Sequence, residues 1–262
     1  MALLRVSRLR ALLDASPVSQ IALALMREAT GRTEPLAAIA PARPAALRRG
    51  RRVGFWSLAA GAGSSTVAAL LAHRSAAGGE APLLVDLDRW VPALALRAGL
   101  TAANVADALL QPGRERDLVS RWSAIPFLPG APTLHATFDG ERLIGLVDSC
   151  AAGRAAVLDL GCGADALDPA ILSSLDRLCL VAGTRSAQLQ AVFCAAPLLA
   201  RVPCAVGLVV VGAGEDDAAR VAERAGFPLL AAIPFDGYLA DDAFAARAPT
   251  LRAVDVLLRA LT

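Results

Sequence analysis

A short run of glycines and hydroxyl residues carries the strongest chemical signal in the sequence. It follows the apolar segment 53–58, precedes the helical pattern 64–77 and consists of Gly61, Ala62, Gly63, Ser64, Ser65 and Thr66. Glycines let the backbone curl until several N–H groups converge, and the N-terminus of the following helix adds partial positive charge. The run therefore predicts an anion nest suited to phosphate, although a plain strand-to-helix turn can use the same residues.

Three aspartates end two other apolar segments. Asp86 and Asp88 close the run 82–88, and Asp159 lies near the end of the run 155–161. Carboxylates beside a phosphate repel it unless a cation lies between them, and Mg²⁺ takes oxygen ligands while keeping several waters. We expect Mg²⁺ to be held directly by the Ser65 hydroxyl and through water by Asp159. Each aspartate taken alone is also compatible with a helix cap or a surface position.

The composition excludes several kinds of chemistry. All 26 basic residues are arginine, so Schiff-base chemistry, Ser-Lys dyads and a P-loop with its usual lysine are excluded. The two histidines are far apart in the sequence, which gives no metal site of the zinc type. The five cysteines form no CxxC pair and lie mostly in apolar runs, which indicates buried free thiols in a reducing compartment.

Apolar strands alternate with helical stretches from residue 53 onward. We expect strands at 53–58, 82–88, 125–130, 155–161, 177–183, 204–212 and 228–235. We expect helices at 64–77, 102–110, 114–122, 140–152, 168–175 and 250–261. This alternation predicts an α/β fold with a parallel, mostly doubly wound sheet and helices on both faces. Ligands then bind at the carboxyl ends of the strands, which is where the glycines and aspartates fall.

Residues 1–52 differ in charge from the rest of the chain. They hold ten arginines and three acidic residues, a net charge of +7, whereas residues 53–262 carry −5. Helical patterns at 2–14 and 17–30 lead into a segment rich in proline and glycine, which predicts a short basic helical arm and linker. The arm could bind weakly to a membrane or to DNA, or be a solvated linker. With no export signal or membrane span evident, we expect a cytoplasmic protein, in one interpretation peripheral to the inner face of the membrane.

In type and order these segments resemble the ParA/MinD family of deviant Walker-A ATPases. The family's loop KGGxGK[ST]T, its strand ending in VDxD and its later strand ending in D-x-P correspond to AAGAGSST (59–66), LLVDLD (83–88) and VLDLGCG (157–163). The resemblance covers residues 53–262, as a P-loop NTPase domain. Within the family, GAGSST is most similar to the loop of the TadZ/CpaE group, which acts in Tad-pilus localisation and also lacks the P-loop lysine.

The resemblance implies ATP and Mg²⁺ as ligands and a homodimer as the working form. Residues 61–66 would bind the phosphates, and Ser65, Asp86 and Asp159 would hold Mg²⁺, mostly through water. Asp88 would orient the attacking water if the protein is active.

The stretch before the family's contact to the nucleotide base resembles FPLLAAIPFDG (227–237), which places Pro234 at the base. The family's base-contacting asparagine is missing, because Gly212 and Ala213 occupy that region.

Two lysine positions of the family are lost. Ser64 stands where the lysine of the β- and γ-phosphates would be, and Ala59 where a second lysine would reach across the dimer. Because phosphoryl transfer depends on positioning and charge neutralisation, we expect weak or absent hydrolysis. Arg89 and Arg185, at predicted strand ends, are candidates to replace the charge, although a surface role also fits each of them.

The preferred interpretation is a degenerate nucleotide-binding protein that acts as a localisation or assembly factor, with partners in a pilus, secretion or polar-localisation machine. One alternative is an active ATPase switch for chromosome or plasmid partitioning, or for division or flagellar positioning. Another is an NAD-binding Rossmann oxidoreductase, which Thr66 in place of the third glycine and the missing lysine disfavour. A serine hydrolase is disfavoured by the absence of a G-x-S-x-G motif.

Overall fold

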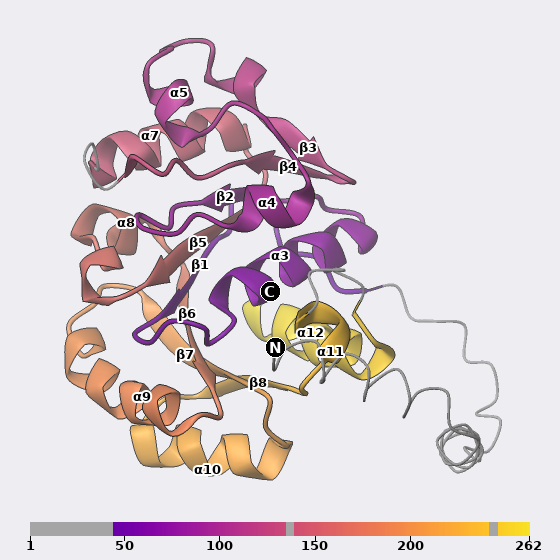
Figure 1. The fold of residues 1–262 in the computed structure, drawn as a ribbon, viewed down its shortest axis with the longest axis vertical. Coiled ribbons are helices and arrows are strands. Elements are labelled where there is room, and N and C mark those ends of the chain that lie inside the picture. Colours follow the sequence, from indigo (N-terminus) through magenta and orange to yellow (C-terminus); the bar gives the residue numbers. More distant parts are fainter. Residues whose placement is uncertain (1–43, 135–138, 241–245) are drawn as a thin grey trace, which may run out of the picture. The chain divides into compact units, whose positions relative to one another are not determined.

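The computed structural model describes residues 44–134, 139–240 and 246–262 (Figure 1). The helices predicted at 2–14 and 17–30 lie outside these ranges, as does most of the predicted arm. The described end of the predicted linker packs on the main body of the chain. Leu47 is fully buried there, and its N–H donates to the Ser75 hydroxyl at 3.0 Å. The division of the chain at residue 52 stays a prediction.

The described strands form one sheet in the order β3-β4-β2-β5-β1-β6-β7-β8. They are β1 (Arg52–Ser57), β2 (Leu83–Asp86), β3 (Ser120–Trp122), β4 (Ile125–Leu128), β5 (Ala156–Cys162), β6 (Arg177–Gly183), β7 (Ala205–Val211) and β8 (Leu229–Ile233). All neighbouring pairs are parallel except β3 with β4. The mostly parallel sheet predicted from the apolar runs is confirmed, and all seven predicted strands are present.

Helices cover both faces of this sheet (Figure 1). They are α3 (Ser64–Ala77), α4 (Leu94–Ala98), α5 (Val105–Leu109), η1 (Glu115–Leu118), α7 (Gly140–Ala151), η2 (Ala164–Ala166), α8 (Pro169–Ser174), α9 (Ser186–Leu199), α10 (Glu215–Ala225), α11 (Gly237–Ala240) and α12 (Ala248–Leu261). Helices α3 and α12 pack on one face, and α7, α8, α9 and α10 on the other. Neighbouring residues of one strand therefore enter different cores, as Phe55 and Trp56 of β1 do.

One predicted helix is wrong in part. Residues 114–122 form only the short helix η1, and β3 takes the place of its C-terminal half. Trp122 pairs with Ile125 across the turn at Ser123, and its ring packs on His73 at a centroid distance of 4.9 Å. Burial of this indole in the core under α3 outweighs the local helical pattern. Helix α4 was not predicted from the sequence.

No helix in the described ranges is both long and apolar enough to span a membrane.

Candidate functional site

The glycine-rich loop joins β1 to α3 at the carboxyl edge of the sheet. Gly61 has φ +72° and Gly63 has φ +98°, a left-handed backbone that residues with a side chain rarely adopt. Helix α3 begins at Ser64 with no side-chain cap and no acidic residue in its first turn. Its first N–H groups and its positive dipole end therefore suit an anion, and the predicted binding of phosphate here stays a prediction.

Asp159 lies in β5, the neighbour of β1 in the sheet, and is almost completely buried. Its Oδ1 accepts the Gly161 N–H at 3.2 Å, whereas its buried Oδ2 has no hydrogen-bond partner among the described residues. Burial raises the pKa of Asp159 to about 6, and the nearby Ser65 side chain opposes this rise. A buried carboxylate oxygen without a hydrogen-bond partner destabilises the folded state unless a cation or an ordered water contacts it.

Asp86 is the register partner of Asp159, on β2, and is equally buried. Its Oδ1 accepts the Asp88 N–H at 3.1 Å, and its Oδ2 accepts the Leu94 N–H at 3.2 Å. Burial, followed by the nearby charge of Asp159, raises the pKa of Asp86 well above its usual value. In this structure Asp86 therefore holds the chain after β2 in place and fixes the start of α4. Its predicted contact with Mg²⁺ through water stays a prediction.

The side chain of Asp88 lies beside the glycine-rich loop. Its Oδ1 accepts the N–H groups of Trp90 and Val91, each at 2.9 Å. The carboxylate lies so close to Gly161 that a Cβ there would come within 2.4 Å of Asp88 Cγ. Gly161 is therefore required both by this approach and by its φ of +70°. The water-orienting role of Asp88 stays a prediction.

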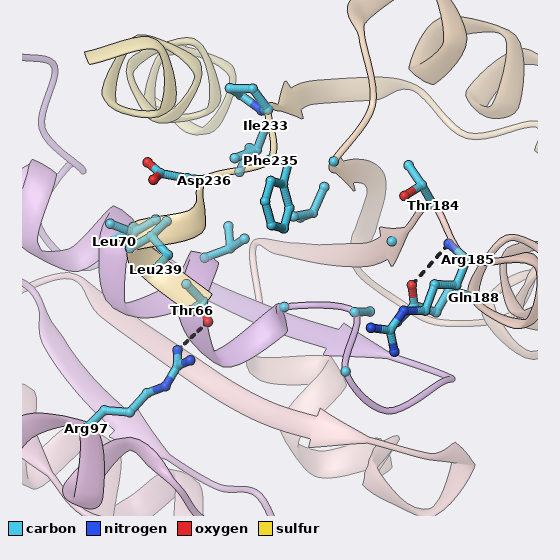
Figure 2. Close-up of a pocket in the computed structure, with 18 residues that line it drawn as sticks. Thr66, Leu70, Arg97, Thr184, Arg185, Gln188, Ile233, Phe235, Asp236 and Leu239 are labelled. Atoms are coloured by element: carbon cyan, nitrogen blue, oxygen red, sulfur yellow. Dashed lines mark hydrogen bonds between the residues drawn. The ribbon is translucent and has the colours of Figure 1, made fainter. Parts of the chain in front are cut away.

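Two cavities meet at the glycine-rich loop. The loop cavity, of about 370 Å³, is lined by the first turn of α3 (Ser64, Ser65 and Thr66) together with Asp88 and Gly161. The strand-end cavity, of about 310 Å³, lies between α3 and the ends of β6, β7 and β8 (Figure 2).

The strand-end cavity is the more apolar in its side chains, with Val67, Leu70, Val211, Ile233, Pro234 and Phe235 in its wall. Ala62 lines it as well, and Gly61, Gly63, Thr66 and Arg97 line both cavities. The structure thus brings the predicted loop residues, Asp88 and Pro234 to two adjoining cavities that share part of their lining. Asp86 and Asp159 are buried and line neither cavity. The size and lining of the pair suit a phosphate chain joined to a flat, apolar ring.

Arg97 is the site residue that the sequence did not reveal. It lies on α4, and its Nη1 donates to the Thr66 hydroxyl (Figure 2). Both residues line both cavities. Its charge also favours the ionised form of Asp159 and so lowers that group's pKa. An arginine in a five-residue helix gives no local signal, because only the fold brings α4 to the start of α3.

Of the two arginines proposed from sequence, Arg185 lines one of the two cavities and Arg89 lines neither. Burial lowers the pKa of Arg89, which the charges of Asp165 and Asp168 oppose, and Arg89 lines neither cavity. Arg185 is the N-cap residue of α9 and lines the strand-end cavity, opposite Thr66 (Figure 2).

The donor set fits hydrated Mg²⁺ better than a metal caged by protein. In the described part of the chain no three His, Cys, Asp or Glu side chains converge on one point. Mg²⁺ commonly binds one or two protein oxygens and completes its octahedron with phosphate oxygens and water. The bare Oδ2 of Asp159 and the Ser65 hydroxyl would suffice for such a site.

Comparison with solved structures supports this arrangement at the level of the fold. The ParA family ATPase of Chlorobium tepidum TLS superposes with a TM-score of 0.68 at 20% identity, over 80% of this chain and 99% of that one. The septum site-determining protein MinD of Pyrococcus horikoshii OT3, complexed with Mg-ADP, gives 0.66 at 20% identity, over 79% and 94%. A putative plasmid partition protein of Borrelia burgdorferi B31, bound to AMPPNP, gives 0.65 at 14% identity, over 81% and 98%.

No protein-family model and no curated protein sequence matches the chain. At these identities the likeness confirms the predicted P-loop NTPase fold and carries no function with it.

Proposed function

We propose that this chain is a nucleotide-binding protein of the ParA/MinD type. It binds ATP with Mg²⁺, hydrolyses it slowly or not at all, dimerises, and acts as a localisation or assembly factor. One observation carries the proposal. Gly61 and Gly63, both with a left-handed backbone, lead into the first turn of α3, and the buried Asp159 nearby has a carboxylate oxygen without a hydrogen-bond partner. Two neighbours of the same fold are bound to Mg-ADP and to AMPPNP, which supports the choice of ligand.

Each of the two cavities has a role in this proposal. The N–H groups of the loop and of the first turn of α3 bind the phosphates, and Ser65 and Asp159 hold Mg²⁺. Mg²⁺, when bound, neutralises charge on the phosphates. The apolar wall that contains Pro234 and Phe235 receives the base.

The proposal of slow hydrolysis rests on Ser64. This residue opens α3 and lines the loop cavity, yet it offers a hydroxyl where the related loops carry a lysine. Since the transferred phosphoryl group needs charge neutralisation in its transition state, a neutral side chain there should slow the reaction strongly. The Tad-type role rests on the similarity of GAGSST to the TadZ/CpaE loop.

The surface around the cavities supports dimerisation. Val91 and Phe235 line the cavities and are largely exposed, as are Trp90, Leu96 and Tyr238, which are chain neighbours of lining residues. Exposed apolar side chains gathered at one edge commonly mark a protein interface. Analytical ultracentrifugation with and without ATP and Mg²⁺ tests this part, and a monomer under both conditions would contradict it.

One observation favours the alternative of an active ATPase switch: Arg97 places a cation in the loop cavity despite the missing lysine. Phosphate release by the purified protein separates the two proposals. A rate near the buffer background supports the localisation factor, and the variant Ser64→Lys should then raise it. Turnover typical of an ATPase in the unmodified protein would favour the switch.

Calorimetry of ATP with Mg²⁺ tests the nucleotide site itself. We expect the unmodified protein to bind, and both Asp159→Ala and Gly63→Val to lose binding while remaining folded by circular dichroism. NADH is the comparison ligand and should not bind. No binding at about millimolar ATP, a concentration that detects interactions of only about 4 kcal/mol, would overturn the proposal.

A further inference from the structure

The loop cavity has an unbalanced set of charges. Asp88 lines it, and the buried Asp159 accepts the N–H of Gly161, which also lines it. A phosphate chain would bring further negative charge to the same place. Among the described residues that line this cavity, Arg97 is the one cation.

Arg97 reaches the point where a phosphate chain would have to pass. Its guanidinium donates to the hydroxyl of Thr66 in the first turn of α3, and it borders both cavities (Figure 2). A ligand with its ring in the strand-end cavity and its phosphates in the loop cavity crosses that junction. The planar guanidinium offers several donors in a fixed fork, which suits phosphate oxygens.

The fold holds the backbone of α4 independently of the guanidinium. The N–H of Leu94, the first residue of α4, donates to buried Asp86, and the Leu94 side chain is fully buried in the core under α3. Gly99 ends the helix with φ +63°. The arginine side chain is thus carried on an anchored helix, and a substitution at Arg97 should leave that anchor intact.

We propose that Arg97 binds the phosphate chain of the nucleotide, in place of the lysine that the glycine-rich loop lacks. The inference rests on the proposed function, because it assigns a residue to the same nucleotide site. On binding, the guanidinium turns part of its donors from Thr66 to the phosphate oxygens. The cation then comes from the segment after β2, instead of from the loop itself.

The test is the affinity of the full chain for ATP, pyrophosphate and adenosine in the presence of Mg²⁺, measured by competition against a fluorescent ATP analogue. Arg97→Ala should weaken ATP and pyrophosphate binding about 10- to 100-fold, the usual effect of losing a hydrogen bond to a charged group. Adenosine binding should stay within about twofold, since it lacks phosphate. Arg97→Lys keeps the charge without the fork and should be intermediate.

Two controls separate a binding role from a structural one. Arg224→Ala removes the same charge from an exposed position on α10 that lines neither cavity, and it should change no affinity. Arg97→Gln keeps much of the side-chain length, so it serves if the alanine variant folds poorly by thermal unfolding.

The outcomes are distinguishable. If the unmodified protein binds ATP and the Arg97 variants bind it equally well, the inference is overturned and the proposed function stands. Equal losses for ATP and adenosine would show a structural role and also overturn it. If the unmodified protein binds no ATP, the proposed function fails and the inference fails with it.

Discussion

The walls of the loop cavity and of the strand-end cavity are formed by different parts of the polypeptide. The loop cavity is shaped by backbone: left-handed glycines, helix N–H groups, and aspartates whose oxygens are held by main-chain donors. The strand-end cavity is walled mainly by apolar side chains from four separate elements. Backbone geometry tolerates little change, whereas an apolar wall can be repacked. Substitutions at glycines of the first cavity should therefore cost stability as well as affinity, whereas substitutions in the second should cost affinity alone.

The largest effect is expected for Gly161→Ala, in the loop cavity. The new Cβ would meet Asp88 at 2.4 Å in a left-handed backbone, displacing the carboxylate that holds Trp90 and Val91. We expect a loss of about 4 kcal/mol in the free energy of unfolding, measured by urea denaturation.

Gly113→Ala is the matched control, because Gly113 has φ +85° but a Cβ added there would meet nothing within 4 Å. It should cost about 1 kcal/mol, the backbone penalty alone. Equal losses in the two variants would show that the contact with Asp88 contributes nothing.

The second effect is a dependence of stability on pH that comes from Asp159. Burial raises its folded pKa from 3.8 to about 6, so the folded state binds this proton more tightly than the unfolded state does. The contribution of Asp159 to the free energy of unfolding of the unligated protein is therefore largest below about pH 4. It falls by about 3 kcal/mol as the pH rises through 6.

Asp159→Asn should flatten this part of the profile and abolish Mg²⁺-dependent ATP binding. Denaturation at a series of pH values measures the first effect, and calorimetry the second. A variant whose stability still falls between pH 4 and 6 to the same extent would assign the effect to another group.

A smaller effect is expected in the strand-end cavity, for Phe235→Ala. The ring lines the cavity although 75% of the residue's surface is exposed, so it is available to cover a ligand (Figure 2). We expect ATP affinity to fall about tenfold, in the range of one stacking contact, with stability changed by less than about 0.5 kcal/mol. Phe193→Ala, on α9 and outside both cavities, should leave affinity unchanged. If Phe235→Ala lowered the free energy of unfolding by much more than this, the proposed difference between the two cavities would be wrong.

The smallest effect is expected for Arg185→Ala. Arg185 is exposed at the start of α9, and solvent screens its charge. Its removal should weaken ATP binding by no more than about fivefold, the range of an exposed ion pair. If Arg185→Ala lost more ATP affinity than Arg97→Ala in the same competition assay, Arg185 and not Arg97 would be the cation that binds the phosphates.

The strands and the glycine-rich loop were predictable because their signals are local. Fully apolar runs such as 177–183 indicate strands buried on both faces, and the structure has β6 in that place. The helix predicted at 114–122 is only partly present, because burial of Trp122 beside Ile125 favours a strand over the last three residues.

Within the site, local signals located the glycine-rich turn before α3 and the three aspartates, but not the contacts that each aspartate makes. Asp86 has the same type and burial as Asp159, yet both of its oxygens accept backbone N–H groups, whereas one oxygen of Asp159 is bare. No spacing in the sequence distinguishes the two residues. Arg97 was missed for the same reason, since its partner Thr66 lies 31 residues earlier in the chain.

The sequence by itself determined which chain segments meet at the carboxyl edge of the sheet, because strand periodicity and the handedness of crossovers leave few alternatives. It also determined that a lysine cannot act there, since the chain has none. Only the tertiary structure decided which cation stands in the loop cavity. That choice depends on where Asp86 and the core hold α4, a consequence of contacts between segments that are distant in the chain.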